Sequence, residues 1–336
     1  MAPSRRGGTA ALLAAVLAAS SCAGADEAVD VSGSSTVEPI SIAVAEQLTE
    51  VRPDVQTIVD GPGTGDGFKL FCAGDIDIND ASSKIKPEQV EECSDAGISF
   101  IELQIANDGI AVMTSEENTD VDCLSFADLY ALTGPEAQGT ATWDAAEELA
   151  RELGSTTDLP ELPLDLTGPG EESGTYASYL EIVLEDLAEE RGVEDVVTRP
   201  DYQASGDDNV TIRGVQGSRG SLGWVGFAYA AGAEGVALLA VDDGESGCVV
   251  PSDATIADGS YPISRPLFLY VNPAKVDENP DVGDFVDFYL SDEGISRVSS
   301  VGYVPLPPAQ LAATRARWDG RVTGAAGDEQ GVSADG

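Results

Sequence analysis

Hydrophobic and polar positions follow two periods along most of the chain, and the pattern predicts an α/β fold. Short apolar runs of strand length alternate with segments whose apolar side chains recur every three or four residues, as on one helix face. This alternation is typical of a mainly parallel sheet that binds ligands at the carboxyl ends of its strands. We expect strands at 29–32, 56–59, 76–79, 98–104 and 104–114, helices at 36–51, 66–73, 87–93, 143–153 and 282–290, and an irregular loop at 154–170.

Residues 31–51 combine a strand, a tight turn and a helix. Ser35 and Glu38 stand in S-x-x-E register, which predicts a capping box, and Pro39 falls in the first helical turn. The first amides of such a helix have no intrahelical partner, and the helix dipole adds positive charge there. The turn can therefore bind an anion without a basic side chain. The alternative is an ordinary N-cap between a strand and a helix.

Two further glycine-opened turns carry hydroxyl groups and favour the anion hypothesis. Residues 171–175, EESGT, open a helix with an apolar face up to Leu187 and a stop at Gly192. Residues 61–67, GPGTGDG, precede the apolar residues of another helix. Three such turns suggest a composite anion site.

An ordered set of motifs resembles the phosphate-binding proteins of phosphate ABC transporters, the PstS family. The motifs span about residues 28–306: GSSTVEP at 33–39, GTGDGFKxFC at 63–72, DIxxxAS at 77–83, GPGxxSGT at 168–175, DYxASxDDNV at 201–210, GSLGWVGFAYA at 220–230 and SRPLFLYV at 264–271. Each motif alone is weak, but their order and spacing are specific.

The resemblance implies a two-lobed periplasmic-binding-protein-like fold of type II, with a ligand cleft between lobes joined by two strands. Lobe one would comprise residues 29–106 and 265–319, and lobe two residues 107–264. It also implies a monomeric binding protein that delivers inorganic phosphate to an ABC permease with its ATPase, needs no cofactor and is not an enzyme.

Carried over residue by residue, the resemblance implies eight phosphate ligands. Lobe one would supply three loops and lobe two the loop that faces them, with one arginine added from lobe two: Ser35, Thr36, Thr64, Ser82, Ser173, Gly174, Thr175 and Arg199. Hydroxyl groups and backbone amides can surround a tetrahedral oxyanion with charge-assisted hydrogen bonds of about 1.5–3 kcal/mol each.

The chain departs from the family pattern at two positions. Many members have an arginine where Pro169 stands, and Arg199 is a candidate replacement, although it could equally pair with local carboxylates. Many have an aspartate where Ser82 is aligned, and a carboxylate accepts a hydrogen bond from protonated phosphate but repels sulfate. Ser82 itself or one of four carboxylates could take that role: Asp66, Asp80, Asp207 and Asp208.

Four aromatic or amide residues lie beyond the lobe-two loop at 173–175 in the sequence. Tyr202 and Asn209 are expected to line the cleft, whereas Trp224 and Phe227 are expected in the core.

The charge balance excludes two classes of partner. The chain has 60 Asp plus Glu against 17 Lys plus Arg, and it contains no histidine. Such a surface repels nucleic acids and anionic lipids and is compatible with a salt-rich environment. The absence of histidine also excludes histidine-dependent triads and metal sites. Anion binding remains compatible, because hydrogen bonds act at about 3 Å while distant carboxylates are screened.

The N-terminus reads as a targeting segment. Arg5 and Arg6 precede an apolar run too short to span a bilayer, and residues 19–22, ASSC, resemble a bacterial lipobox. We therefore expect a signal peptide at 1–21, lipidation of Cys22, a linker at 22–28 and an extracytoplasmic protein held at the membrane only by its lipid. The alternative is an ordinary secretory signal. The glycine- and acid-rich segment 320–336 is expected to be a disordered tail.

Four cysteines remain after Cys22, and an even number in an exported chain predicts two disulfides. Three pairings are possible, of which we favour Cys72 with Cys93 and Cys123 with Cys248. The sequence contains no C-x-x-C pair, so we do not expect a zinc site.

Three other functions stay open. The ligand could be another oxyanion (sulfate, molybdate or tungstate), since the usual aspartate is absent. A secreted phosphatase could use Ser35 or Ser173 as nucleophile, but no histidine exists to activate it. The third possibility is a structural or adhesive surface lipoprotein that no longer binds a ligand.

Overall fold

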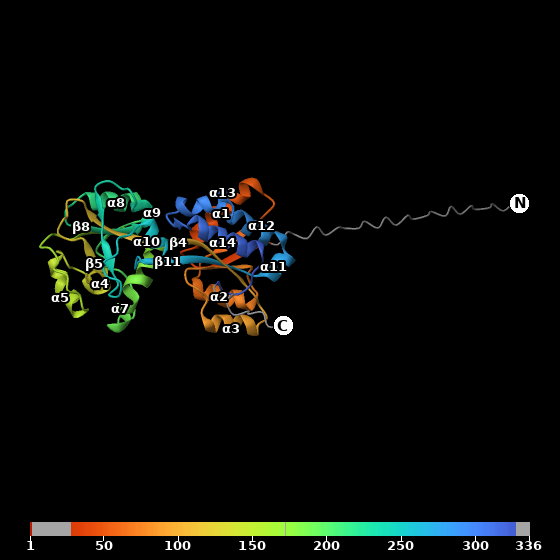
Figure 1. Ribbon diagram of the computed structural model, residues 1–336, viewed down its shortest axis with the longest axis horizontal. Helices are drawn as coiled ribbons and strands as arrows, with labels where there is room; N and C mark the ends of the chain where they lie inside the picture. The colour runs from red at the N-terminus through yellow and green to blue at the C-terminus, as the bar shows by residue number, and fades with distance from the viewer. Residues whose placement is uncertain (2–27, 172, 327–336) are drawn as a thin grey trace.

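The computed structural model describes Met1 and residues 28–171 and 173–326, which form two α/β lobes joined by two long strands (Figure 1). One hydrophobic cluster draws its residues from 110–263, together with Val304. Two further clusters draw theirs from 29–106 and 267–318. The predicted two-lobed architecture is therefore confirmed.

Within the described residues, ten strands form one long sheet, and two more form a small separate sheet. Their bounds are β1 Val29–Gly33, β2 Thr57–Asp60, β3 Ile78–Ala81, β4 Ile101–Ser115, β5 Cys123–Ser125, β6 Asp165–Pro169, β7 Gln203–Ser205, β8 Ser221–Gly226, β9 Val236–Leu238, β10 Ala240–Asp242, β11 Ser264–Val271 and β12 Val304–Pro305. The long sheet has the order β2-β1-β3-β11-β4-β8-β6-β7, with β9 and β12 also on β4, and β5 pairs with β10.

The two strands between the lobes are β4 and β11. β4 pairs antiparallel with β11 over Ile101–Gly109 and with β8 over Ile110–Thr114, so this one strand belongs to both lobes. The sequence predicted two strands here, 98–104 and 104–114. A nearly continuous buried segment gives no polar alternation from which one long strand could be told from two short ones. β11 brings the chain back to lobe one.

Helices cover the sheet in both lobes. Their bounds are α1 Glu38–Val51, α2 Thr64–Ala73, α3 Pro87–Asp95, α4 Phe126–Thr133, α5 Glu147–Glu152, α6 Gly174–Tyr179, the π-helical turn η3 Leu180–Leu184, α7 Glu185–Glu190, α8 Asp208–Gln216, α9 Phe227–Ala230, α10 Asp253–Ala257, α11 Pro273–Glu278, α12 Pro280–Tyr289, α13 Asp292–Ser300 and α14 Pro308–Asp319, with 3-10 turns η1 Pro135–Ala137 and η2 Asp144–Ala146. In lobe one, α1, α12 and α13 lie on one side of the sheet and α2 and α3 on the other (Figure 1).

Three further features of the fold differ from what the sequence led us to expect. Residues 165–169 of the expected loop at 154–170 form β6, which pairs with both β7 and β8. Helix α14 was not predicted at all. Residues 320–326 of the expected disordered tail pack on lobe one, where Gly324 bridges to Ile101 and the Ala326 amide donates to Glu102 at 3.0 Å.

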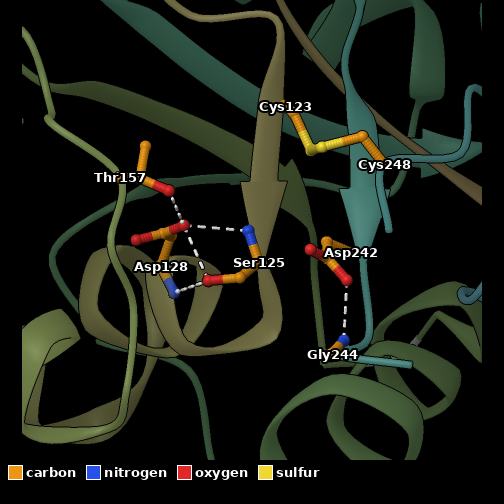
Figure 2. Close-up of a disulfide and its surroundings, with 7 residues drawn as sticks. All are labelled: Cys123, Ser125, Asp128, Thr157, Asp242, Gly244 and Cys248. Carbon is orange, nitrogen blue, oxygen red and sulfur yellow. Dashed lines mark hydrogen bonds between the residues drawn. A yellow bond between two sulfur atoms is a disulfide. The ribbon is translucent and has the colours of Figure 1, made fainter. Parts of the chain in front are cut away.

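Both favoured disulfides are confirmed, Cys72–Cys93 and Cys123–Cys248. The second joins residue 123 at the start of β5 to residue 248 beyond β10 (Figure 2). Beside it Asp128, which is fully buried, accepts hydrogen bonds from the Ser125 amide and hydroxyl at 2.8 and 2.7 Å and from Thr157 at 2.8 Å. The disulfide therefore lies next to a satisfied buried polar cluster.

No helix among the described residues is both long and apolar enough to cross a bilayer. The predicted signal peptide beyond Met1, Cys22, most of the linker and residues 327–336 lie outside the described residues.

Candidate functional site

The lobe-one part of the site lies where three parallel strands end. β1 pairs in parallel with β2 and β3, so the segments that follow all three strands leave the same edge of the sheet. Gly33 ends β1 with φ +143°, and a Cβ there would lie 2.2 Å from the Asp80 carbonyl oxygen. Only glycine permits this approach, which brings the first loop against the third.

The first loop caps its helix differently from the prediction. α1 begins at Glu38, its N-cap residue Val37 makes no side-chain cap, and the Ser35–Glu38 capping box is wrong. Instead the Ser34 hydroxyl accepts from the amides of Thr36 and Val37 at 3.2 and 3.4 Å. A tight turn at 35–37 precedes the helix and places Ser34 beneath these amides. Pro39 does fall in the first turn as predicted.

Thr64 and Ser82, predicted in the second and third loops, lie together. Their hydroxyl groups are 3.1 Å apart, and Thr64 Oγ1 also accepts from the Ser82 amide at 3.1 Å. Two hydroxyl groups that share one hydrogen bond keep one hydrogen for another acceptor. The pair can therefore donate to an anion.

The lobe-two loop begins a helix at Ser173. The Ser173 hydroxyl accepts from the Thr175 amide at 3.2 Å, and α6, η3 and α7 continue as one helical run to Glu190. Gly192, with φ +72°, lies just past its end as predicted. A serine that accepts in a cap can still donate its own hydrogen to a ligand.

The predicted loops of the two lobes meet. A Cβ at Gly174 would lie 3.4 Å from the Ser35 carbonyl oxygen and 3.5 Å from Thr36 Cα. One helical turn further, Thr36 Oγ1 and Ser178 Oγ are 3.2 Å apart and buried. Side chains from residues 142 positions apart thus form one contact between the lobes.

An arginine outside the predicted set of ligands lies at this contact. Arg265 on β11 donates from Nη2 to Thr36 Oγ1 at 2.9 Å and to Ser178 Oγ at 2.7 Å. Its side chain is 10% exposed. The sequence offered a signal, since the SRPLFLYV motif contains this residue, but nothing in its position indicated that β11 passes beside the first loop.

Two carboxylates form ion pairs with Arg265. Asp108 Oδ2 on β4 lies 3.6 Å from its Nε, and Glu181 pairs with its Nη1. Burial raises the pKa of Asp108, and the Arg265 guanidinium offsets part of that effect. The buried cation, which β11 carries, therefore lies between a carboxylate of β4 and one of the lobe-two helical run.

Arg199, the cation predicted as a ligand, lies elsewhere in lobe two. All three guanidinium nitrogen atoms are engaged: Nε and Nη2 donate to the Asp201 carboxylate at 2.7 and 2.8 Å, Nη2 also to Thr140 O, and Nη1 to Leu132 O. This geometry favours the structural alternative for Arg199, because a guanidinium with satisfied donors has little left for a ligand.

A cavity of about 230 Å³ opens between the lobes beside Gly174. It is lined by Pro39, Ser173, Gly174, Thr175, Gly206, Asp208, Tyr229, Val301, Gly302 and Tyr303. Of the predicted ligands, the whole SGT loop lines this cavity, whereas Ser35, Thr36, Thr64 and Ser82 are not among its lining residues.

Two of the four aromatic or amide residues expected in the core or the cleft lie where the sequence predicted them. Trp224 and Phe227 are buried, as predicted. Tyr202 and Asn209 do not line the cavity: the Tyr202 hydroxyl donates to Pro169 O at 2.6 Å, and the Asn209 amide donates to Asp207 at 2.9 Å. These bonds hold the two residues within lobe two.

Comparisons with known proteins agree with the fold and the motifs. A family model described as the PBP superfamily domain matches residues 18–293. The protein SphX of Synechococcus elongatus is 38% identical over 296 residues, which cover 87% of this chain and 81% of the relative. The phosphate-binding protein PstS of Staphylococcus aureus is 30% identical over 278 residues, covering 82% and 77%.

Among solved structures, one described as a possible phosphate binding protein from Planctomyces limnophilus has a TM-score of 0.78 at 34% identity, and it covers 89% of this chain and 100% of that one. A phosphate transport receptor from Vibrio cholerae, at 19% identity and a TM-score of 0.58, shares the fold. With the family model spanning most of both lobes, the chain belongs to the PBP superfamily and, within it, to the family of the phosphate-binding proteins named PstS.

Proposed function

We propose that this protein is an extracytoplasmic receptor that captures inorganic phosphate between its lobes and delivers it to an ABC permease. The observation that carries the proposal is the contact of the Ser35–Thr36 turn of lobe one with Gly174 and Ser178 of lobe two, beside the buried guanidinium of Arg265. The names of the relatives support phosphate as the ligand.

The site would hold the anion with hydroxyl groups, main-chain amides and one cation. Ser35, Thr36, Thr64 and Ser82 would contribute from lobe one, and Ser173, Gly174 and Thr175 from lobe two. Arg265, in place of Arg199, would supply the positive charge, because it lies at the contact of the two lobes and its buried Nε has no hydrogen-bond partner among the described residues. Several charge-assisted bonds of about 1.5–3 kcal/mol each suffice for micromolar binding after the costs of association.

Ligand binding would favour lobe closure, since only the closed form brings both sets of donors to one anion. The lobes would comprise residues 29–106 with 265–319 and residues 107–264, and the hinge would lie where β4 leaves β11 for β8, near Gly109. The permease would recognise the closed form.

The lipid anchor at Cys22 is part of the same proposal. Labelling of growing cells with a fatty-acid analogue should mark the wild-type protein but not Cys22→Ala, and the variant should appear in the soluble extracytoplasmic fraction. Equal labelling of both proteins would exclude this anchor.

Isothermal titration of the purified protein with phosphate, sulfate, molybdate and methylphosphonate tests the ligand. We expect phosphate to bind at micromolar concentration or below and the others far more weakly. Heat with sulfate or molybdate but none with phosphate would instead assign another oxyanion.

A pair of serine variants links binding to the site. Ser173→Ala should weaken phosphate binding at least tenfold, because it removes a hydroxyl donor beside the cavity. Ser260→Ala, at an exposed position, is the matched control and should bind as the wild type does.

A further inference from the structure

Thr64 and Ser82, the hydroxyl pair of the lobe-one site, belong to two different loops. Thr64 is the first residue of α2, and Ser82 directly follows β3 in the segment that leads to α3. Their hydroxyl groups lie 3.1 Å apart, while α2 and α3 lie side by side on one face of the sheet (Figure 1). What fixes α2 against α3 therefore also fixes the geometry of the pair.

A disulfide joins the two helices. Cys72 near the end of α2 is bonded to Cys93 on α3, and these residues are only 2% and 0% exposed. The chain between them contains β3 and Ser82. The covalent loop thus contains one member of the hydroxyl pair and starts on the helix that begins with the other. A cross-link of this kind restricts the positions that the enclosed segment can adopt.

A buried tyrosine holds the segment between Ser82 and α3. The Tyr270 hydroxyl accepts from the Ile85 amide at 2.8 Å and donates to Glu102 Oε2 at 2.9 Å, while Glu102 Oε1 accepts from the Ala326 amide at 3.0 Å. Tyr270 and Glu102 are 0% and 1% exposed. Burial and the Glu102 carboxylate raise the pKa of Tyr270, so the hydroxyl keeps the hydrogen that it donates. Without this hydroxyl the Ile85 amide would lose its acceptor in a buried place, so Tyr270 fixes the main chain just after Ser82.

Both supports belong to one small hydrophobic cluster of lobe one. Its buried members are Phe68, Phe71, Cys72, Ile76, Ala81, Ile85, Cys93, Phe100, Phe268 and Tyr270. The rings of Phe68 and Phe100 meet the Tyr270 ring edge-on at 4.9 and 5.6 Å. These cluster residues do not line the cavity between the lobes. They can therefore act on an anion only through the loops that they hold.

We propose that the Cys72–Cys93 disulfide and Tyr270 are positioning residues, which hold the Thr64 and Ser82 hydroxyl groups in place before the anion binds. A ligand that meets donors already in place loses less free energy to ordering them. The inference rests on the proposed function, because it takes this pair as donors to phosphate. It makes phosphate affinity depend on residues that the ligand does not touch.

Removal of the disulfide tests the first support. In Cys72→Ala/Cys93→Ala, phosphate binding measured by isothermal titration of the full chain at pH 7 should weaken about five- to 20-fold, because the two loops then become ordered only on binding. Cys123→Ala/Cys248→Ala is the matched control, since it removes the disulfide of lobe two. It should lower the melting temperature but leave phosphate affinity within about twofold of the wild type.

Tyr270→Phe tests the second support. The substitution keeps the aromatic ring in its cluster and removes only the hydroxyl that accepts from Ile85, so phosphate should bind about three- to tenfold more weakly. Tyr130→Phe is the control, because Tyr130 is also fully buried and its hydroxyl donates to Glu136 at 3.0 Å in lobe two. This control should bind phosphate as the wild type does.

A double-mutant cycle shows whether the supports act through the hydroxyl pair. Thr64→Val removes the hydroxyl, keeps the shape of the side chain and should weaken phosphate binding by itself. In the Thr64→Val background, loss of the disulfide or of the Tyr270 hydroxyl should weaken binding by no more than about twofold further, because the pair is already broken.

Three results would overturn the inference while the proposed function stands. The first is the same fold-change with and without the Thr64 hydroxyl. The second is wild-type affinity in both Cys72→Ala/Cys93→Ala and Tyr270→Phe, and the third is equal weakening in the two lobe-two controls. A wild type that binds no phosphate removes the proposed function as well. Each variant is titrated well below its melting temperature, and Cys72→Ser/Cys93→Ser replaces the alanine pair if that variant does not fold.

Discussion

Single residues set the charge of the site in a chain that has few cations. Arg265 is one of 17 Lys and Arg residues, yet its buried guanidinium contacts Thr36, Ser178, Asp108 and Glu181 at once. A planar guanidinium can make these contacts together, whereas an ammonium is a point charge on a flexible stem.

Two substitutions of Arg265 should therefore show how much of the phosphate affinity comes from its positive charge and how much from the shape of the guanidinium. We expect Arg265→Gln to weaken phosphate binding about 10- to 100-fold, the loss of one or two charge-assisted bonds, and Arg265→Lys to fall between it and the wild type. Titration calorimetry measures the effect, with Arg213→Gln on the exposed face of α8 as control. Unchanged affinity in Arg265→Gln would remove Arg265 from the site.

Asp80 should make the free energy of unfolding depend on pH. Burial raises its pKa to about 8, and the nearby Ser41 hydroxyl offsets only part of that effect. The folded state then holds a proton that the unfolded state releases above about pH 4, so Asp80 lowers stability progressively as the pH rises from about 4 to 8.

Asp80→Asn removes this titration and should raise the melting temperature relative to the wild type more at pH 8 than at pH 5. The stability difference between the two pH values should be on the order of a few kcal/mol. Thermal melts of both proteins across this range provide the measurement, and an equal offset at both pH values would show that Asp80 is ionised in the folded protein.

At the scale of elements, the site depends on how closely the start of α6 approaches the turn before α1. Gly174 leaves little room beyond a Cβ, which would lie 3.1 Å from the Tyr303 hydroxyl and 3.4–3.5 Å from the main chain of Ser35 and Thr36. The approach requires glycine for its size rather than for its backbone angles.

A graded series at Gly174 should oppose closure of the lobes. We expect Gly174→Ala to weaken phosphate binding modestly and Gly174→Val to weaken it at least 100-fold, because the added methyl groups must displace a main-chain carbonyl or prevent closure. Small-angle scattering should then show a phosphate-dependent decrease in radius for the wild type but not for Gly174→Val. Equal affinities in the series would mean that the closed contact is not needed for binding.

At the scale of the whole molecule, the acidic excess opposes folding. A net formal charge of −43 on one chain repels itself, and salt shortens the screening length from about 10 Å at 0.1 M to about 3 Å at 1 M. The melting temperature should therefore rise by several degrees between 0.1 and 1 M NaCl.

The control for this prediction is an uncharged osmolyte at equal osmolality, which should not reproduce the part of the increase that comes from screening. Potassium chloride should act like sodium chloride. A melting temperature that does not change with salt would show that the surface carboxylates are spaced widely enough not to interact.

The sequence alone predicted the α/β class and the helix start at Ser173 from local periodicity and from glycine and serine at turns. An ordered set of motifs added the two-lobed fold through the resemblance to a known family. The even number of cysteines predicted two disulfides, but the favoured pairing was one of three until the structure brought Cys123 to Cys248. The Ser35–Glu38 cap failed because Ser34, one position away, has the same chemistry, and φ at Gly33 decides which serine lies under the turn.

Only the tertiary structure decided which distant residues share the site. β11 returns to lobe one beside the first loop, and this places Arg265 against Thr36 across 229 positions of sequence. Packing within lobe two buries Arg199 against Asp201 and the Leu132 and Thr140 carbonyls, and the meeting of the lobes brings Asp208 and Tyr303 into one cavity. Contacts between remote segments arise from how the strands pair and the lobes meet, which no local pattern of the chain encodes.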